Sequence, residues 1–555
     1  MSETRAQPST RPSPTSTMVS TPSSEVDDPM RRESTATAAA PTGQEENDNG
    51  NARNIIDLEK QPNRSDEPAG GLTRGDRTNA QGERKQSAEK DNEWVVKWDG
   101  PDDPHDPLNT PGWKKWLMTI ILAAACVCVT CCSSMAGSTY AGMRETFGVG
   151  EEVCILSISL FVAGLGVGPL FLGPCSEFIG RSKVLYWSFA AFFLLNFPVT
   201  FANNIAVHLI FRFFTGFAGS AFLTVSGGLI SDCFRNEKVG SPMLLFSAAP
   251  FLGPVLGPLI SGFINENTDW RWTFYVILIW SAVTLGLLLI FVRETFSPEL
   301  LRRKAVRMRK ETGEQRWVAP IEQVDRTFSE ALKKSIKTPF VLLSTQMMVL
   351  FLDLWSAMIL GILYLSFGGI PFIFREQYGF SLQQTGMTFL GIGCGQVIAC
   401  CAQPYFNKRY RAVSAKYNGK APPEERLVPG FFGAIFAPLG LLLLGLTCFK
   451  TVHWIVPIIL SSFFGMGMVF AFTSTFTYLV DAYRPVAASA LASNSFMRSA
   501  FAAGFPLFGQ QLYKRLGAVG GTCLLAGLMC LAIPLPFIFY RIGARVRART
   551  TYAAS

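Results

Sequence analysis

The chain has 555 residues, of which 49% are hydrophobic and only 16% are charged, whereas soluble domains carry about a quarter charged residues. Its apolar residues gather in long charge-free runs rather than in domains with polar surfaces, which excludes an ordinary cytosolic protein. The net charge of +9 hides a division, because residues 1–112 carry 13 Lys and Arg against 21 Asp and Glu, and residues 113–555 carry 37 against 20. The N-terminal part is acidic and the rest of the chain is basic.

Residues 1–112 are rich in Ser, Thr, Pro, Asn and Gln and have no periodic apolar pattern. Such a segment cannot bury enough surface to offset its ordering entropy, so we predict a disordered tail. It has no apolar core of about 7–15 residues, so it is not a secretory signal peptide. Its many Ser and Thr leave open the alternative of a phosphoregulated tail.

From residue 116 onward, apolar windows alternate with short charged connections. A membrane-spanning helix needs about 20 mostly apolar residues. The windows, free of charge except for Asp353 and Arg498, are 116–143, 153–176, 184–211, 213–231, 239–265, 272–292, 338–374, 377–407, 427–449, 451–480, 485–513 and 516–540. We predict twelve transmembrane helices. A polar break at Asn203 and Asn204 places Arg212 inside the fourth.

The spacing of the windows predicts two related halves. The first six occupy residues 113–293 and the last six occupy 339–541, with a charged middle loop at 294–338 and a C-terminal tail at 542–555. Two groups of six with a long middle loop are typical of duplicated transporters. The predicted fold class is therefore an all-α polytopic membrane protein with two six-helix bundles, and the duplication rests on hydropathy alone.

The distribution of Lys and Arg predicts the orientation in the membrane. If the tail is cytoplasmic, the inner loops and C-terminus carry 27 Lys and Arg and the outer loops carry six. Cytoplasmic loops hold the excess of positive charge, so we expect both termini and the middle loop on that side. A solvated surface near lipid head groups explains the basic middle loop, and we expect no nucleic-acid partner.

Three ionisable residues lie inside predicted spans: Arg212, Asp353 and Arg498. Charge inside the bilayer is costly, so such residues are functional candidates. A buried carboxyl suits a group that loads and releases a proton, and an arginine can anchor an anion or modulate a carboxyl. We predict Asp353 and Arg212 as proton-coupling residues and Gln346, Asn494 and Arg498 as cavity residues. The alternative for Asp353 is a structural pair with a neighbouring helix.

Other chemistries have little support in the sequence. The chain has three His, which leaves proton transfer to carboxylates, and we expect no metal site. It has no phosphate-binding loop, no dehydrogenase fingerprint and no catalytic cluster, so we expect neither an enzyme nor a cofactor. The driving force must then be an ion gradient.

The loop after the second predicted helix carries a glycine and charge pattern. It contains Gly173, Glu177, Gly180, Arg181 and Lys183, which predict a tight turn with a charge cluster at the membrane surface. Glu177 can cap a helix or pair with a basic residue. The pattern resembles the major facilitator superfamily signature G-x-x-x-D-x-x-G-R-[RK], with Glu in place of Asp and the last basic residue displaced by one. The resemblance implies the major facilitator fold.

Two further segments resemble motifs of that superfamily. Residues 212–219 resemble R-x-x-x-G-x-x-G in helix 4, whose arginine is implicated in proton coupling. Gly253, Pro254, Gly257 and Pro258 resemble the antiporter motif G-P-x-x-G-G of helix 5, with Pro258 in place of the last Gly. Glycine permits close helix approach, and proline frees a carbonyl and bends the helix.

Six further stretches resemble the fungal twelve-spanner drug:proton antiporters, which include multidrug and polyamine exporters. They are residues 270–274, 294–305, 361–365, 423–427, 488–494 and 505–508. The resemblance covers residues 105–545. It implies a plasma-membrane exporter whose partners are a small-molecule substrate, protons and the bilayer.

The chain departs from the polyamine-type members, many of which carry an acid just before the proline that ends helix 7. The sequence before Pro371 has none, and Asp353 lies 15 residues before Gly368, about 22 Å along a helix. One embedded acid against two embedded arginines favours neutral or anionic lipophilic substrates over polycations. The acids at helix ends, Asp232, Glu294 and Asp481, could still line the mouth of a cavity.

Our leading hypothesis is a monomeric, proton-driven exporter of drugs or of one fungal secondary metabolite, working by alternating access. The alternatives are a polyamine exporter, an uptake symporter on the same fold, and, from a different class, a membrane receptor that does not transport. The helix 5 motif argues against the symporter.

Overall fold

The computed structural model describes residues 94–235, 238–323, 327–417, 421–548, 550 and 552. Within these ranges, regular structure is helical apart from an isolated parallel bridge between Val95 and Val318. The predicted all-α class is confirmed. Residues 1–93 of the predicted tail lie outside the described part.

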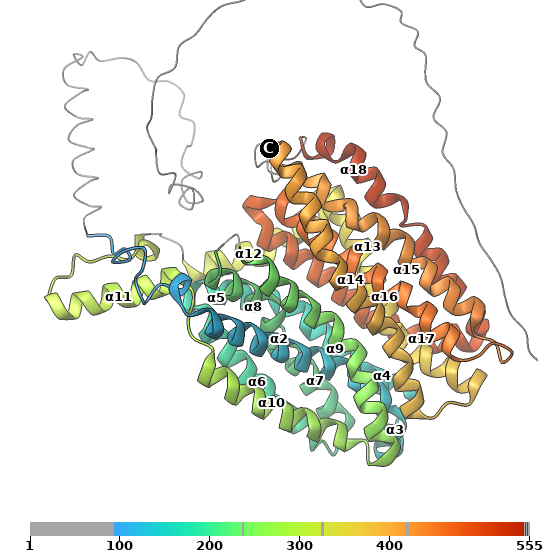
Figure 1. Ribbon diagram of the computed structural model, residues 1–555. Helices are drawn as coiled ribbons and strands as arrows, with labels where there is room; N and C mark the ends of the chain where they lie inside the picture. Colours follow the sequence, from blue (N-terminus) through green and yellow to red (C-terminus); the bar gives the residue numbers. More distant parts are fainter. Residues whose placement is uncertain are drawn as a thin grey trace, which may run out of the picture. The chain divides into compact units, whose positions relative to one another are not determined.

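The first group of helices precedes the middle segment (Figure 1). Its members are α2 (Gly112–Met135), α3 (Tyr140–Phe147), α4 (Glu151–Val167), α5 (Pro169–Ile179), α6 (Arg181–Thr200), α7 (Ile205–Gly219), α8 (Ala221–Cys233), α9 (Gly240–Asn267) and α10 (Arg271–Phe291). Helices α4 and α5 form one bent pair, with 41° between them, and Pro169 begins the second. The break fits proline, which cannot donate to the preceding turn.

The middle segment and the second group follow. The middle segment contains α11 (Ser297–Thr312), η3 (Pro320–Gln323) and α12 (Phe328–Thr345). The second group contains α13 (Met347–Tyr378), α14 (Leu382–Lys416), η4 (Pro423–Leu427), α15 (Val428–Thr447), α16 (Ile455–Ala482), η5 (Arg484–Val486), α17 (Ala487–Cys530) and α18 (Pro534–Arg547). In Figure 1 these helices are yellow to red, whereas the first group is blue to green.

The described helices agree with twelve crossings. Ten segments are long and apolar enough to span a membrane, and the bent pair α4–α5 makes eleven. One of the ten, Arg484–Arg547, has 64 residues, which as a helix would measure about 95 Å against a hydrocarbon core of about 30 Å. It is interrupted at Gly517, whose φ is 71° and ψ is 177°. Counted as two crossings, it completes the predicted twelve.

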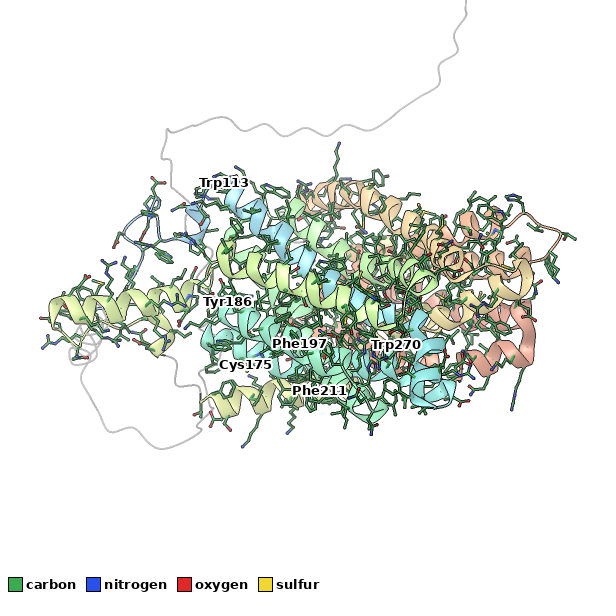
Figure 2. The ribbon with its side chains drawn as sticks, turned by 90° about the horizontal axis from the view of Figure 1, so that it is seen from below. Trp113, Cys175, Tyr186, Phe197, Phe211 and Trp270 are labelled. Atoms are coloured by element: carbon green, nitrogen blue, oxygen red, sulfur yellow. The ribbon has the colours of Figure 1, made fainter. Side chains whose placement is uncertain are left out.

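Two tryptophans fit alternating crossings. Trp113 at the start of α2 and Trp270 just before α10 lie toward opposite ends of the helices in Figure 2. These residues open the first and the sixth span, which enter the membrane from opposite sides. Trp113 is 65% exposed, as expected of a tryptophan at a membrane interface.

Several boundaries differ from the sequence prediction. The seventh span was predicted as a continuous window from 338, but α12 ends at Thr345 and α13 begins at Met347. Gln346 lies between them with non-helical φ −108° and ψ 99°, so it does not extend the helix that carries Asp353. The last helix continues to Arg547, past the predicted end of the second half at 541.

Small residues allow the helices to approach closely. Helix α9 packs on α2 within the first group and on α14 of the second, and α4 packs on α17. A Cβ at Gly253 would overlap the side chain of Thr130 on α2, and one at Gly257 would overlap that of Ser134. Such close contact is the usual basis of helix association in membranes.

The residues just before α2 are held against the middle segment, although composition predicted a disordered tail up to residue 112. We call residues 94–103 the strap. The backbone N–H of Val96 donates to the carbonyl of Val318 (3.0 Å), and that of Val318 donates to the carbonyl of Trp94 (2.9 Å). The rings of Trp94 and Trp317 meet edge to face with centroids 5.1 Å apart.

Side chains add to the attachment of the strap. Val96 is 1% exposed and packs with Ala305 of α11 and Ala319 in a small apolar cluster. Lys304 of α11 donates to Asp99 at 2.6 Å. The strap therefore has an apolar centre and a charged edge.

Gly253→Ala and Gly286→Ala form a matched pair that tests the α2–α9 contact. Nothing lies within 4 Å of a Cβ at Gly286 in α10. We expect Gly253→Ala to cost about 1–3 kcal/mol through overpacking, and Gly286→Ala to be neutral or stabilising by up to about 1 kcal/mol. Thermal unfolding of the detergent-solubilised protein measures both. Equal unfolding temperatures for the two variants would contradict the close contact.

Val96→Asp tests whether the strap is docked. The new carboxylate at position 96 would lie against Ala305 and Ala319 without a polar partner. We therefore expect the strap to detach and trypsin to cleave after Lys97 at least about tenfold faster than in the unmodified protein. The control is Trp113→Ala, which removes an exposed ring. Mass spectrometry of a digestion time course gives the rates, and unchanged cleavage in Val96→Asp would refute the docking.

Candidate functional site

Asp353 is the centre of a buried polar cluster between α13 and α17. Its side chain is fully buried. Ser493 Oγ donates to Asp353 Oδ2 at 2.9 Å, and Asn494 Nδ2 donates to Asp353 Oδ1 at 2.8 Å. Asn494 Nδ2 also lies 2.7 Å from Ser356 Oγ. The carboxyl is thus held by neutral donors, so either its charged or its protonated form can be accommodated without breaking an ion pair.

Arg498 lies one helical turn after Asn494 on α17. Its guanidinium lies over the rings of Phe472 and Phe476 of α16, 5.2 and 4.8 Å from their centroids. The structure thus brings two of the predicted cavity residues, Asn494 and Arg498, to the neighbourhood of Asp353.

Gln346 does not join this cluster through any described hydrogen bond. Its amide nitrogen donates to Thr345 Oγ1 at 3.3 Å, and its Oε1 is buried without a partner among the described residues. The break in the helix at Gln346 separates it from the turns of α13 that carry Asp353, and its place in a cavity stays a prediction.

Arg212 occupies a separate buried site in the first group. It is fully buried, and its Nε donates to the carbonyl of Ser157 at 3.0 Å. Its two terminal nitrogens donate to Cys132, one to the carbonyl (3.1 Å) and one to Sγ (3.2 Å). Its guanidinium carbon lies over the ring of Phe161, 4.5 Å from the centroid. Arg212 and Asp353 therefore belong to different clusters rather than to one pair.

His208 completes the Arg212 cluster, and the sequence analysis gave it no role. Its Nε2 lies 3.0 Å from Ser157 Oγ and its Nδ1 lies 3.0 Å from the carbonyl of Val199. The available signal was its position four residues before Arg212, which puts both on one face of α7.

The predicted turn motif forms a tight connection at one end of the first group. Gly180 has φ 106°, which favours glycine. Arg181 Nε lies 2.7 Å from Asp232 at the end of α8. Glu294 accepts from the backbone N–H of Arg181 (3.1 Å) and of Ser182 (3.2 Å). The turn thereby ties the start of α6 to the ends of α8 and α10.

The remaining residues of the predicted turn motif, Gly173, Glu177 and Lys183, differ in their surroundings. No neighbour lies within 4 Å of a Cβ at Gly173. Glu177 is exposed on α5, away from the pairs formed by Arg181 and Lys183. Lys183 donates to Glu299 of α11 at 3.1 Å.

Glu299 anchors α11 to this end of the helices. Burial raises its pKa, but hydrogen bonds from Arg302, Lys183 and Arg303 outweigh burial, and its pKa lies below the ordinary value. The carboxylate is therefore charged at neutral pH and holds three cations of α6 and α11 together.

A corresponding tie is found in the second group. Arg426, just before α15, lies 2.7 Å from Asp481 near the end of α16, and its guanidinium covers the ring of Tyr410. As with Arg181 and Asp232, the start of the third crossing of the group is joined to the end of the fourth. Residue identities did not reveal this repeat. The helix-end acids Asp232 and Asp481, for which the sequence left open a place at the mouth of a cavity, are engaged in these pairs.

The predicted antiporter motif lies where three helices meet. Gly253 and Gly257 face α2, and the carbonyl of Pro258 lies where a Cβ at Gly386 of α14 would be. Pro254 is buried in the same helix. The motif therefore lies at the contact between the two groups, where a change in packing alters their relative position.

Comparisons with known proteins agree with the motifs. The model of the Major Facilitator Superfamily matches residues 122–506. The efflux pump atB of Aspergillus terreus is 39% identical over 469 residues, covering 83% of this chain and 90% of that protein. The probable drug/proton antiporter YHK8 of Saccharomyces cerevisiae is 37% identical, covering 85% and 92%. The citrinin biosynthesis cluster transporter mrr1 of Monascus ruber is 36% identical, covering 83% and 92%.

Solved structures share the fold. The xylose transporter XylE from E. coli, in a partially occluded inward-open conformation, has a TM-score of 0.55 and 15% identity, covering 78% of this chain and 98% of that chain. The human organic anion transporter MFSD10 has a TM-score of 0.53 and 16% identity, covering 77% and 100%. The protein is a multi-pass membrane protein with the fold predicted from its sequence. The chain belongs to the major facilitator superfamily, among relatives that include fungal efflux pumps and a drug/proton antiporter.

Proposed function

We propose that the protein is a plasma-membrane transporter that exports small lipophilic compounds in exchange for protons. The names of its relatives support this function, since they include efflux pumps, a probable drug/proton antiporter and a transporter of a biosynthetic cluster. The observation that carries the proposal is the fully buried carboxyl of Asp353, held by neutral donors between two helices. No other acid in the described spans is buried away from a helix end.

Protonation of Asp353 would change the interactions between α13 and α17. Asn494 now points its amide nitrogen at the carboxylate, and Ser493 donates its hydroxyl. A protonated carboxyl carries a donor of its own and needs an acceptor, so the hydrogen bonds must rearrange. This rearrangement links the protonation state to the packing of the two helices.

Alternating access would move the two groups, residues 113–293 and 339–541, as rigid halves. Contacts between the groups at one end must then break. Glu266 at the end of α9 accepts from the backbone N–H of Leu382, the first residue of α14 (2.9 Å), and Gln511 of α17 donates to Glu152 of α4 (3.3 Å). With both termini cytoplasmic, this end faces outward, and the Arg181 and Arg426 ties lie on the cytoplasmic side. We expect one chain to suffice, since both halves are covalently joined.

The charges inside the spans favour neutral or anionic lipophilic compounds over polyamines. A polycation needs several carboxylates along its path, whereas Asp353 already accepts hydrogen bonds from two side chains. Two arginines inside the spans, the buried Arg212 and the half-buried Arg498, would repel it.

Asp353→Asn tests proton coupling. Asparagine keeps the size and the acceptor oxygen but cannot exchange a proton, so we expect pH-gradient-driven transport to fall at least about tenfold while counterflow exchange without a gradient persists. Proteoliposomes containing the full chain and the neutral dye Nile red provide the measurement. The control is Glu145→Gln, which neutralises an exposed acid of α3.

Full gradient-driven transport in Asp353→Asn would remove this residue from the coupling mechanism. Absence of gradient-driven dye movement in the unmodified protein, together with unchanged drug sensitivity of a deletion strain, would contradict efflux itself.

A further inference from the structure

Arg498 is a half-buried cation of α17 that makes no hydrogen bond among the described residues. Its Nε is shielded from solvent and has no hydrogen-bond partner among the described residues. Its described contacts are the faces of Phe472 and Phe476. Arg212 is different, because all three of its nitrogens donate to protein acceptors. A donor removed from water needs an acceptor, and since the described residues supply none for Nε, a bound compound can supply it.

Asn494, one helical turn before Arg498, has an acceptor oxygen without a donor in the described part of the chain. Asn494 uses its amide nitrogen on Asp353 and Ser356, while its Oδ1 is buried without a partner among the described residues. Residues four apart lie on the same face of a helix, so Asn494 and Arg498 present one unmet acceptor and one unmet donor side by side.

A column of parallel rings lies beside these two residues. Phe251 of α9 stacks on Phe472 of α16 with centroids 5.2 Å apart and planes 6° apart. Phe472 in turn stacks on Phe476, with centroids 6.0 Å and planes 13° apart. Helix α9 belongs to the first group and α16 to the second. If the groups separate, Phe251 moves away from Phe472, and a flat apolar slot opens between these two rings, next to the guanidinium of Arg498.

We propose that Arg498, Asn494 and the stack of Phe251, Phe472 and Phe476 form the substrate-recognition site, and that this site takes neutral, planar, conjugated hydroxy-carbonyl compounds. The ring enters the slot, its carbonyl oxygen accepts from Arg498, and its hydroxyl donates to Asn494 Oδ1. The inference rests on the proposed function and names the substrate class of that transporter.

The exchange of substrate for a proton explains why the compound is neutral. Protonating Asp353 removes a negative charge near Arg498, which strengthens the binding of an anion there. An anion and a proton would then bind together and move in the same direction, the opposite of exchange. A cation is repelled by Arg498. A neutral carbonyl avoids both problems.

Asn494 supplies the competition between substrate and proton. When Asp353 is ionised, the amide nitrogen of Asn494 faces it and Oδ1 is available to a substrate hydroxyl. When Asp353 is protonated, its new O–H requires an acceptor, and rotation of the amide provides Oδ1. The proton and the substrate hydroxyl therefore use the same oxygen.

Equilibrium binding to the purified full chain tests the class. The probes are 7-hydroxycoumarin, coumarin without the hydroxyl, 2-naphthol without the carbonyl, and coumarin-3-carboxylate as the anion. All are measured at the highest pH at which 7-hydroxycoumarin is still mainly neutral, so that protonation of Asp353 competes least for Asn494 Oδ1. We expect 7-hydroxycoumarin to bind at least about tenfold more tightly than either neutral analogue, since a site built for hydrogen bonds rejects compounds that lack them.

Arg498→Met should abolish the preference for 7-hydroxycoumarin over 2-naphthol, and Arg498→Lys should reduce it, because lysine keeps the charge but not the planar donor group. Arg411→Met, at an exposed position of α14, is the matched control. Thermal unfolding verifies that each variant is folded. Phe476→Leu should weaken all planar probes alike.

The outcomes separate the two proposals. No binding of 7-hydroxycoumarin, equal binding of all neutral probes, or an unchanged preference in folded Arg498 variants overturns the substrate class while gradient-driven export of Nile red stands. Tighter binding of coumarin-3-carboxylate than of 7-hydroxycoumarin overturns the neutral class in the same way. Loss of gradient-driven export from the unmodified protein overturns both.

Discussion

The structure depends on one constraint, that a polar or charged group surrounded by hydrocarbon must find its partner on a neighbouring helix. Arg212 meets it with carbonyls and a thiol from α2 and α4. Asp353 meets it with two side chains from α17. Each of these contacts joins helices that are distant in sequence, so the polar interior also determines which helices lie together.

Arg212 and Arg498 meet this constraint to different extents. Arg212 is fully satisfied by the protein, so removing it would disturb the packing of α2, α4 and α7 together. Arg498 is supported only by aromatic faces, which compensate a cation in part. Arg212 and Arg498 thus differ in what they need from outside the chain, and this difference, rather than their number, points to a ligand.

The sequence predicted features that depend on composition and missed those that depend on chain geometry. Twelve spans followed from the lengths of apolar runs, and Asp353, Arg212 and Arg498 stood out because charge is rare in such runs. The break at Gln346 was not predicted because a helix break leaves no compositional trace. Ser493 and His208 were missed, since serine and a single histidine are unremarkable until α17 and α7 are placed beside their neighbours. The strap was missed because its apolar anchors are few and lie in a polar segment.

The attachment of the strap and of α11 shortens the part of the middle segment that can extend when the two halves move apart. By sequence, 45 residues (294–338) join them. Lys183 and Glu299 fasten α11 to the first half, and the strap covers the segment that follows α11. Held along α11 and at Val318 and Ala319, the middle segment acts as a shorter tether than its length in sequence suggests, and it limits how far the halves can separate at this end of the helices.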